Sequence, residues 1–162
     1  EVEPMARGLL TLALLALISG CGKEQEATEL KTYIATIKQL DSYSRRVQAE
    51  ILRFDDPTQE ITNADIVAAF DLLVEYQKAV ADVTPPETST GGNTHDLFVR
   101  SFDEAMGLAS DEKGDTKRRA HSAAIGLRNL RKKLKDRVYP TFNLLMTRLK
   151  MTGEENELSW PE

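Results

Sequence analysis

The sequence predicts an all-α protein that folds as an antiparallel, up-down four-helix bundle. Apolar residues recur at spacings of three and four through most of the chain, which is the period of a helix that buries one face. No run of residues shows the two-residue alternation of a half-buried strand. Proline and glycine gather at a few places that separate the helical stretches. Four amphipathic helices joined by short connections favour a bundle whose neighbouring helices run in opposite directions.

The first helix is predicted over residues 27–54, and it is expected to stop at Asp55-Asp56-Pro57 because the residue before proline avoids helical dihedrals. Its apolar positions follow the a and d pattern of a coiled-coil seam. The seam consists of Leu30, Tyr33, Ile37, Leu40, Ser44, Val47, Ile51 and Phe54. The second helix is expected to begin at Thr62-Asn63-Ala64-Asp65, where a hydroxyl cap and an acidic side chain favour the first turn. It is expected to end at Thr84-Pro85-Pro86, before a loop over residues 83–92.

The third helix is predicted to begin at Asn93 or Thr94 and to end at Gly114. Asp115 is a suitable cap for the fourth helix, which is expected to kink or break near Pro140, because proline lacks an amide donor and clashes with the carbonyl four residues earlier. The helical pattern then resumes to about residue 151. The bundle domain is thus predicted over residues 29–151.

The last segment, residues 152–162, is acidic and is expected to form a flexible tail. It contains Trp160, the only tryptophan of the chain. Trp160 is expected either to dock on the bundle or stay disordered, with a short linear motif for a partner as the alternative.

The N-terminal segment contains the most specific pattern in the sequence. Residues 9–18 form an apolar run in which only Thr11 is polar. A membrane-spanning helix needs about twenty apolar residues, so this run has the length of a signal-peptide core. Arg7 precedes it, and the small residues Ser19 and Gly20 stand directly before Cys21, the only cysteine. This arrangement resembles the lipobox of bacterial lipoproteins.

The resemblance implies that residues 1–20 are a cleaved signal peptide and that Cys21 carries diacylglycerol and an N-terminal acyl chain such as palmitate. Residues 21–28 would then form a polar tether to the membrane. Gly22 stands where an aspartate would retain the protein at the inner membrane, so the resemblance implies the outer membrane, with the body in the periplasm or at the cell surface. An ordinary apolar helix with a free cysteine, or a cleaved signal peptide without lipidation, are the alternatives. The segments around Pro85-Pro86-Glu87 and His95 also resemble several uncharacterised helical lipoproteins.

Charge is distributed unevenly along the chain. Residues 117–150 contain 11 Lys and Arg and one acid, for a net charge of +10, whereas residues 21–116 contain 9 Lys and Arg and 19 acids, for a net charge of −10. The basic helix could simply neutralise its acidic neighbours, with exposed pairs that contribute roughly 0–1 kcal/mol each. Alternatively, it forms an anion-binding face. The candidate residues, at spacings of three and four on one face, are Arg128, Arg131, Lys132 and Lys135.

The up-down topology predicts that this basic cluster lies in the half of the last helix that is nearest to the membrane. Basic residues near an anionic surface contribute about 1 kcal/mol each. Anionic lipid head groups, peptidoglycan carboxylates and an acidic partner protein are the ligands expected from this pattern. The net charge of −5 gives no whole-chain sign of nucleic-acid binding.

Catalytic and metal-binding motifs are not found in the sequence. His95 and His121 stand near helix starts, where each is expected to be a solvated residue, and no Glu-x-x-His pair is present. No catalytic residue, metal site or cofactor is therefore predicted, and the chain is not expected to be an enzyme. The predicted function is a membrane-anchored binding or scaffolding module. The alternative is a carrier of a small apolar ligand or of haem within the bundle core, with Met106 or Met146 and His121 as possible haem ligands.

Overall fold

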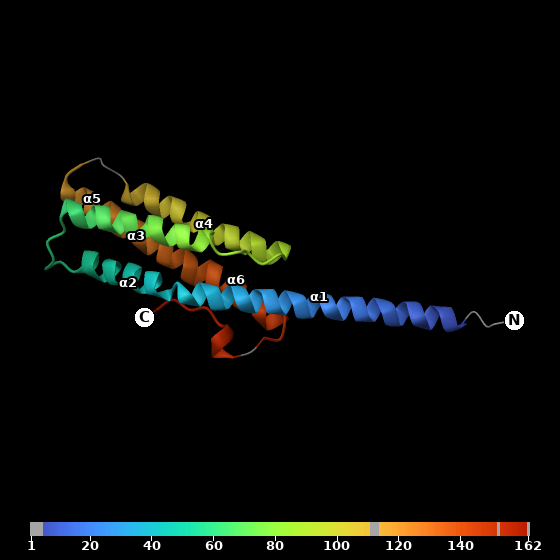
Figure 1. Cartoon of the computed structure of the whole chain (residues 1–162). Coiled ribbons are helices and arrows are strands. Elements are labelled where there is room, and N and C mark those ends of the chain that lie inside the picture. The colour runs from blue at the N-terminus through green and yellow to red at the C-terminus, as the bar shows by residue number, and fades with distance from the viewer. Residues whose placement is uncertain (1–4, 111–113, 152, 162) are drawn as a thin grey trace.

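The computed structural model describes residues 5–110, 114–151 and 153–161, and side chains from residue 22 onward within these ranges except Glu155. The described residues form helices and no strand, which confirms the all-α class (Figure 1). The helices are α1 (Met5–Gln39), α2 (Asp41–Asp55), α3 (Asn63–Ala81), α4 (Ser89–Ala109), α5 (Thr116–Lys133) and α6 (Tyr139–Arg148), together with a π-helical turn (Leu134–Val138) and a 3-10 turn (Glu154–Asn156).

The helices do not form a clean four-helix bundle. In Figure 1, α2, α3, α4 and α5 lie together and alternate in direction, but α1 extends well beyond them, and α5 continues through the π-helical turn into α6 beside α1. The predicted first helix is in fact two helices, and residues 22–28 belong to α1 rather than to an extended tether. No helix in the described part of the chain combines the length and apolar character needed to cross a membrane.

The interruption between α1 and α2 falls at Leu40, in the middle of the predicted seam. Leu40 donates its N–H to the carbonyl of Ile37, and its own carbonyl accepts the N–H of Tyr43. The seam residues on both sides are nonetheless buried, as Tyr33 and Val47 illustrate. On a straight α-helix, a stripe of side chains that repeats every seven residues drifts around the helix axis by ~20° per heptad. The interruption lets both helices keep their apolar faces against the body.

The start of α3 agrees with the predicted cap. The Thr62 hydroxyl accepts the backbone N–H of Asp65, and the Asp65 carboxylate accepts the N–H and hydroxyl of Thr62. These hydrogen bonds and the Arg53 guanidinium lower the pKa of Asp65 to about 2. By contrast, α4 begins earlier than the predicted Asn93, because Thr88 caps it and the following residues already lie in its first turn.

The predicted disturbance at Pro140 takes the form of the π-helical turn. The N–H of Tyr139 bonds to the carbonyl of Leu134, one residue further back than in an α-helix. Pro140 then occupies the first turn of α6, directly after this widened turn, which makes room for its ring. Leu134 and Val138 are fully buried. The helix therefore accommodates the proline without a break in the apolar face.

Aromatic side chains fill the centre of the body. Tyr76 of α3 contacts Phe98 and Phe102 of α4 with ring centroids 6.2 and 4.9 Å apart. Tyr139 lies edge-on to Phe98, and Phe142 packs on Tyr33 of α1. The core thus joins α1, α3, α4 and α6 in one cluster.

The C-terminal segment is packed against the body, so the expectation of a flexible tail over residues 152–162 is wrong for the residues described. Leu158 and Trp160 are 5% and 9% exposed. The side chain of Asn143 donates to the carbonyl of Leu158 and accepts its N–H, both at 2.9 Å. Lys38 donates to the carbonyl of Glu154 at 2.7 Å. Burial of two large apolar side chains outweighs the acidic character from which a loose tail was predicted.

Candidate functional site

The four basic residues predicted from the sequence line one groove, along α5 and the π-helical turn. Its volume is about 530 Å³. The other walls come from Gln48 of α2 and from Trp160 and Pro161 of the C-terminal segment. Asn129 and Asp136 complete the lining. We call this hollow the basic groove.

The four cations differ in how they are held. Arg128 forms an ion pair with Asp55, and the Arg131 guanidinium donates to the side-chain oxygen of Gln48 at 3.4 Å. Lys132 and Lys135 are exposed and form no ion pair with the described side chains. Two cations are thus tied to α2, while two are open to a ligand.

Gln48 connects the basic groove to the C-terminal segment. Its side-chain oxygen accepts the indole N–H of Trp160 at 3.0 Å as well as the bond from Arg131. Trp160 is separated from Gln48 by 112 residues. Sequence reasoning selected the cations of this site but missed Gln48 and Pro161, and it gave Trp160 no place in the site. No local pattern links these segments.

Other basic residues of α5 take part in charge balance. Lys133 pairs with Glu104 of α4, and Arg119 donates to the side chain of Asn63 at 2.9 Å. The Lys133–Glu104 and Arg128–Asp55 pairs account for part of the charge asymmetry as neutralisation between helices. They do not engage Lys132 or Lys135, on which a binding role for the groove depends.

The cations of the basic groove lie in the half of α5 that runs toward α1, as the up-down topology predicts, but they lie far from Cys21 along the chain of helices. Gln48 follows Cys21 by 27 residues, and α1 and α2 lie nearly end to end in Figure 1. At ~1.5 Å per helical residue this is about 40 Å. Arg128 pairs with Asp55, the last residue of α2, at the end away from α1. The expectation that they lie near the membrane assumed a short tether, whereas the structure has a long helix there.

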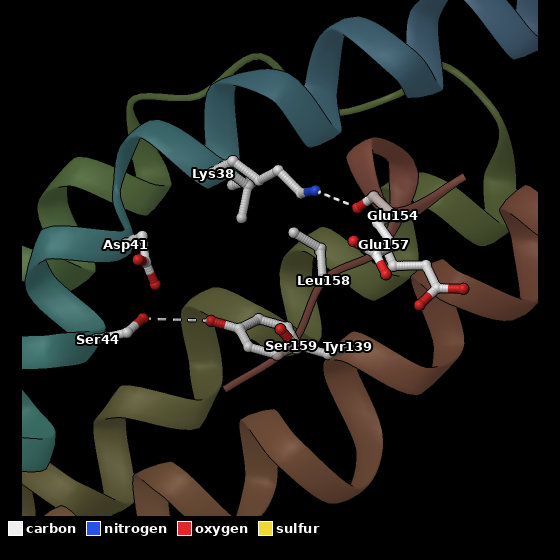
Figure 2. Close-up of a pocket in the computed structure, with 9 residues that line it drawn as sticks. Lys38, Asp41, Ser44, Tyr139, Glu154, Glu157, Leu158 and Ser159 are labelled. Carbon is white, nitrogen blue, oxygen red and sulfur yellow. Dashed lines mark hydrogen bonds between the residues drawn. The ribbon is translucent and has the colours of Figure 1, made fainter. Parts of the chain in front are cut away.

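A second hollow lies where α1 gives way to α2, beside the C-terminal segment (Figure 2). Its volume is about 480 Å³. Charged side chains from α1, α2 and the C-terminal segment surround it, and hydroxyls form part of its wall. Its lining consists of Ile37, Lys38, Asp41, Ser44, Tyr139, Glu154, Glu157, Leu158 and Ser159.

The buried hydroxyls beside this second hollow bond to one another. The Ser44 hydroxyl lies 2.8 Å from that of Tyr76 and 3.4 Å from that of Tyr139, and the two tyrosine hydroxyls are 3.4 Å apart. Burial raises the pKa of both tyrosines, so their hydroxyls stay neutral. These contacts join α2, α3 and α6, and they satisfy polar groups that would otherwise be costly to bury.

The two histidines have different environments, and the expectation of two solvated residues is wrong for His95. The His95 side chain is 5% exposed, and its Nδ1 lies 3.0 Å from the hydroxyl of Tyr33 across the α1–α4 contact. Desolvation lowers the pKa of His95. His121 is exposed and lines a hollow with Phe54 and Ala120 that neither Met106 nor Met146 lines. Among the described residues, no cluster of three or more His, Cys, Asp and Glu side chains is placed to hold a metal ion.

The buried His95 predicts a pH-dependent stability. A histidine whose pKa is lower in the folded state binds fewer protons there than in the unfolded chain, so the free energy of unfolding falls as pH drops through about 6.5, the unfolded value. We expect this decrease between pH 8 and pH 5.5 in the parent protein and a smaller one in His95→Gln. Urea unfolding at both pH values measures the two differences. Equal decreases in both proteins would show that His95 does not cause the effect.

Cys21 lies in α1, but its side chain is outside the described side chains, as are those of the predicted signal peptide. No family model, curated protein or solved structure matches the chain. Function is therefore inferred from the residues and contacts given above.

Proposed function

We propose that this chain is a lipid-anchored protein of the bacterial envelope whose helical body binds anionic groups in the basic groove. The body is a binding module rather than an enzyme. One observation carries the proposal: Arg128, Arg131, Lys132 and Lys135, chosen from helical spacing alone, line a single hollow. Two of these cations have no ion-pair partner among the described side chains, and an aromatic residue stands beside them.

The arrangement favours anion binding for three physical reasons. The contacts of Arg131 with Gln48 and of Arg128 with Asp55 restrain the two guanidinium groups before a ligand arrives, which reduces the entropy lost on binding. The ammonium groups of Lys132 and Lys135 each provide three donors for carboxylate or phosphate oxygens. Finally, the groove is partly walled by Trp160, which excludes water from one side and strengthens charge–charge attraction.

The anchor part of the proposal rests on the lipobox-like residues that end at Cys21. A single acyl chain of myristoyl size gives only marginal membrane binding, whereas two or more chains give a stable anchor. In this arrangement the later part of α1 packs into the helical body, and its first turns after Cys21 connect the body to the lipid. We place the protein at the outer membrane, with the body in the periplasm or at the surface, because Gly22 rather than an aspartate follows the cysteine.

Removal of the two open cations tests the groove. In the full chain carrying Cys21→Ser, Lys132→Gln/Lys135→Gln is expected to weaken binding to vesicles of anionic lipid or to polyglutamate by about thirtyfold at low salt. This figure corresponds to ~1 kcal/mol for each cation. Binding of the parent is expected to weaken as salt rises, because ions screen exposed charges beyond about 8–10 Å. Sedimentation with vesicles and fluorescence titration with polyglutamate measure both effects.

A matched control separates the groove from net charge. Lys23→Gln/Lys31→Gln removes the same charge from exposed positions of α1 and is expected to leave the affinity for polyglutamate nearly unchanged. An equal loss of affinity in both double variants would mean that the binding follows net charge only. Binding that does not respond to salt would also count against the proposal.

A further inference from the structure

We infer that the ligand of the basic groove is an extended acidic segment of a partner protein, with carboxylates on alternate residues, rather than the head groups of the membrane that holds the anchor. This inference rests on the proposed function of the groove and specifies its partner. It is supported by the length of the groove, by the spacing of its cations and by its distance from Cys21.

The length of the basic groove fits a short stretch of extended chain. Its lining runs along α5 and the π-helical turn from Arg128 to Asp136, a separation of eight residues. At ~1.5 Å per residue this is about 12 Å. An extended peptide rises ~3.3 Å per residue, so about four residues fill the same length. Asp136 places a negative charge at the end of this lining, which limits the acidic part of the ligand to the region before it.

The spacing of the cations fits carboxylates on alternate residues. Lys135 follows Lys132 by three residues and Arg131 by four, which brings the Cβ atoms of neighbours on one helix face to about 5–6 Å. In an extended chain, residues i and i+2 lie on the same side and are about 6.6 Å apart. Long lysine side chains cover the remaining difference. Two carboxylates at alternate positions can therefore each meet a cation at the same time.

The residue between the two acids points to the opposite side of an extended peptide. In the groove, Trp160 and Pro161 form a wall that this middle side chain can contact. The indole N–H of Trp160 donates to the side-chain oxygen of Gln48 at 3.0 Å, and this hydrogen bond holds the indole ring in place. A small or apolar side chain is therefore expected between the two acids.

The distance of the basic groove from Cys21 argues against the anchoring membrane as the ligand. About 40 Å of helix separates Cys21 from Gln48, whereas charges in physiological salt are screened beyond about 8 Å. The first residues after the cysteine, from Gly22 to Gln25, are exposed and lie clear of the body. When α1 extends away from the membrane, the lipid head groups near Cys21 are too far from the groove to contact it. A partner protein in solution can reach the groove.

Two peptides of equal composition test the spacing. One eight-residue peptide carries two glutamates separated by an alanine, and the other carries the same two glutamates side by side; all remaining residues are glycine, serine and alanine. Each is titrated into the full chain carrying Cys21→Ser, and the fluorescence of Trp160 is followed. We expect the alternating peptide to bind at least threefold more tightly. We also expect its binding to be lost in Lys132→Gln/Lys135→Gln and kept in Lys23→Gln/Lys31→Gln.

Vesicles of anionic lipid form the second arm of the experiment, with the same proteins. Equal affinity for the two peptides would overturn the alternate-residue spacing. Groove-dependent binding to vesicles without binding to either peptide would overturn the acidic segment as ligand, while the proposed anion-binding function would stand. Binding to neither probe would overturn both.

Discussion

Gly126→Ala is expected to lower the free energy of unfolding by about 1–3 kcal/mol, although a glycine-to-alanine change inside a helix is ordinarily stabilising. Gly126 of α5 lies where α5 meets α4. A Cβ atom at this position would lie 2.5 Å from the backbone carbonyl oxygen of Ala105 and 3.4 Å from the Cβ of Leu108. A backbone oxygen cannot rotate away as a side chain can, so the two helices must separate.

Gly107→Ala provides the matched control on the partner helix α4. A Cβ atom there meets nothing within 4 Å, so we expect an increase of about 0.5–1 kcal/mol from the lower conformational entropy of the unfolded chain. Urea unfolding of the two variants and the parent measures both changes. If Gly126→Ala is as stable as Gly107→Ala, the close approach of α4 and α5 is not a constraint on the fold.

Cys21→Ser, with residues 1–20 removed, is expected to be found completely in the aqueous fraction of the cell envelope instead of the membrane fraction. The serine hydroxyl cannot take the place of the thiol in the lipid-transfer reaction that the lipobox resemblance implies. Each buried CH₂ group of an acyl chain contributes about 0.8 kcal/mol, so loss of several chains removes nearly all membrane affinity. Fractionation and immunodetection measure the distribution.

Ser19→Ala is the control for this change, because it keeps a small residue before the cleavage point and leaves the thiol in place. It is expected to remain with the membrane. Intact-mass analysis of the parent should show the acyl chains on a product that begins at Cys21. An unmodified thiol, or a Cys21→Ser protein that stays with the membrane after residues 1–20 are removed, would contradict the lipid anchor.

Local sequence patterns predicted much of this structure because they depend on neighbours along the chain. The cap formed by Thr62 and Asp65 involves residues three apart, and the disturbance before Pro140 follows from proline's own covalent geometry. The common face of Arg128, Lys132 and Lys135 likewise follows from helical spacing. In each case the pattern and the structure that it produces lie within two turns of helix.

Features that depend on distant segments could not be predicted in this way. Trp160 and Gln48 meet only because the C-terminal segment folds back over α2. The burial of His95, by contrast, had a local signal that was missed. His95 lies three residues before Phe98 and seven before Phe102, so it shares the buried face of α4. A polar residue at such a spacing is better interpreted as a hydrogen-bonded core residue than as a solvated helix start.

The indole N–H of Trp160 provides the most direct test of anion binding in the basic groove, because the chain contains a single tryptophan and therefore a single indole resonance. We predict that a short glutamate peptide shifts this resonance in a saturable way at low salt, and that the shift disappears at high salt and in Lys132→Gln/Lys135→Gln. A resonance that stays in place while the peptide binds and shifts backbone amides elsewhere in the chain would contradict the basic groove as the binding site.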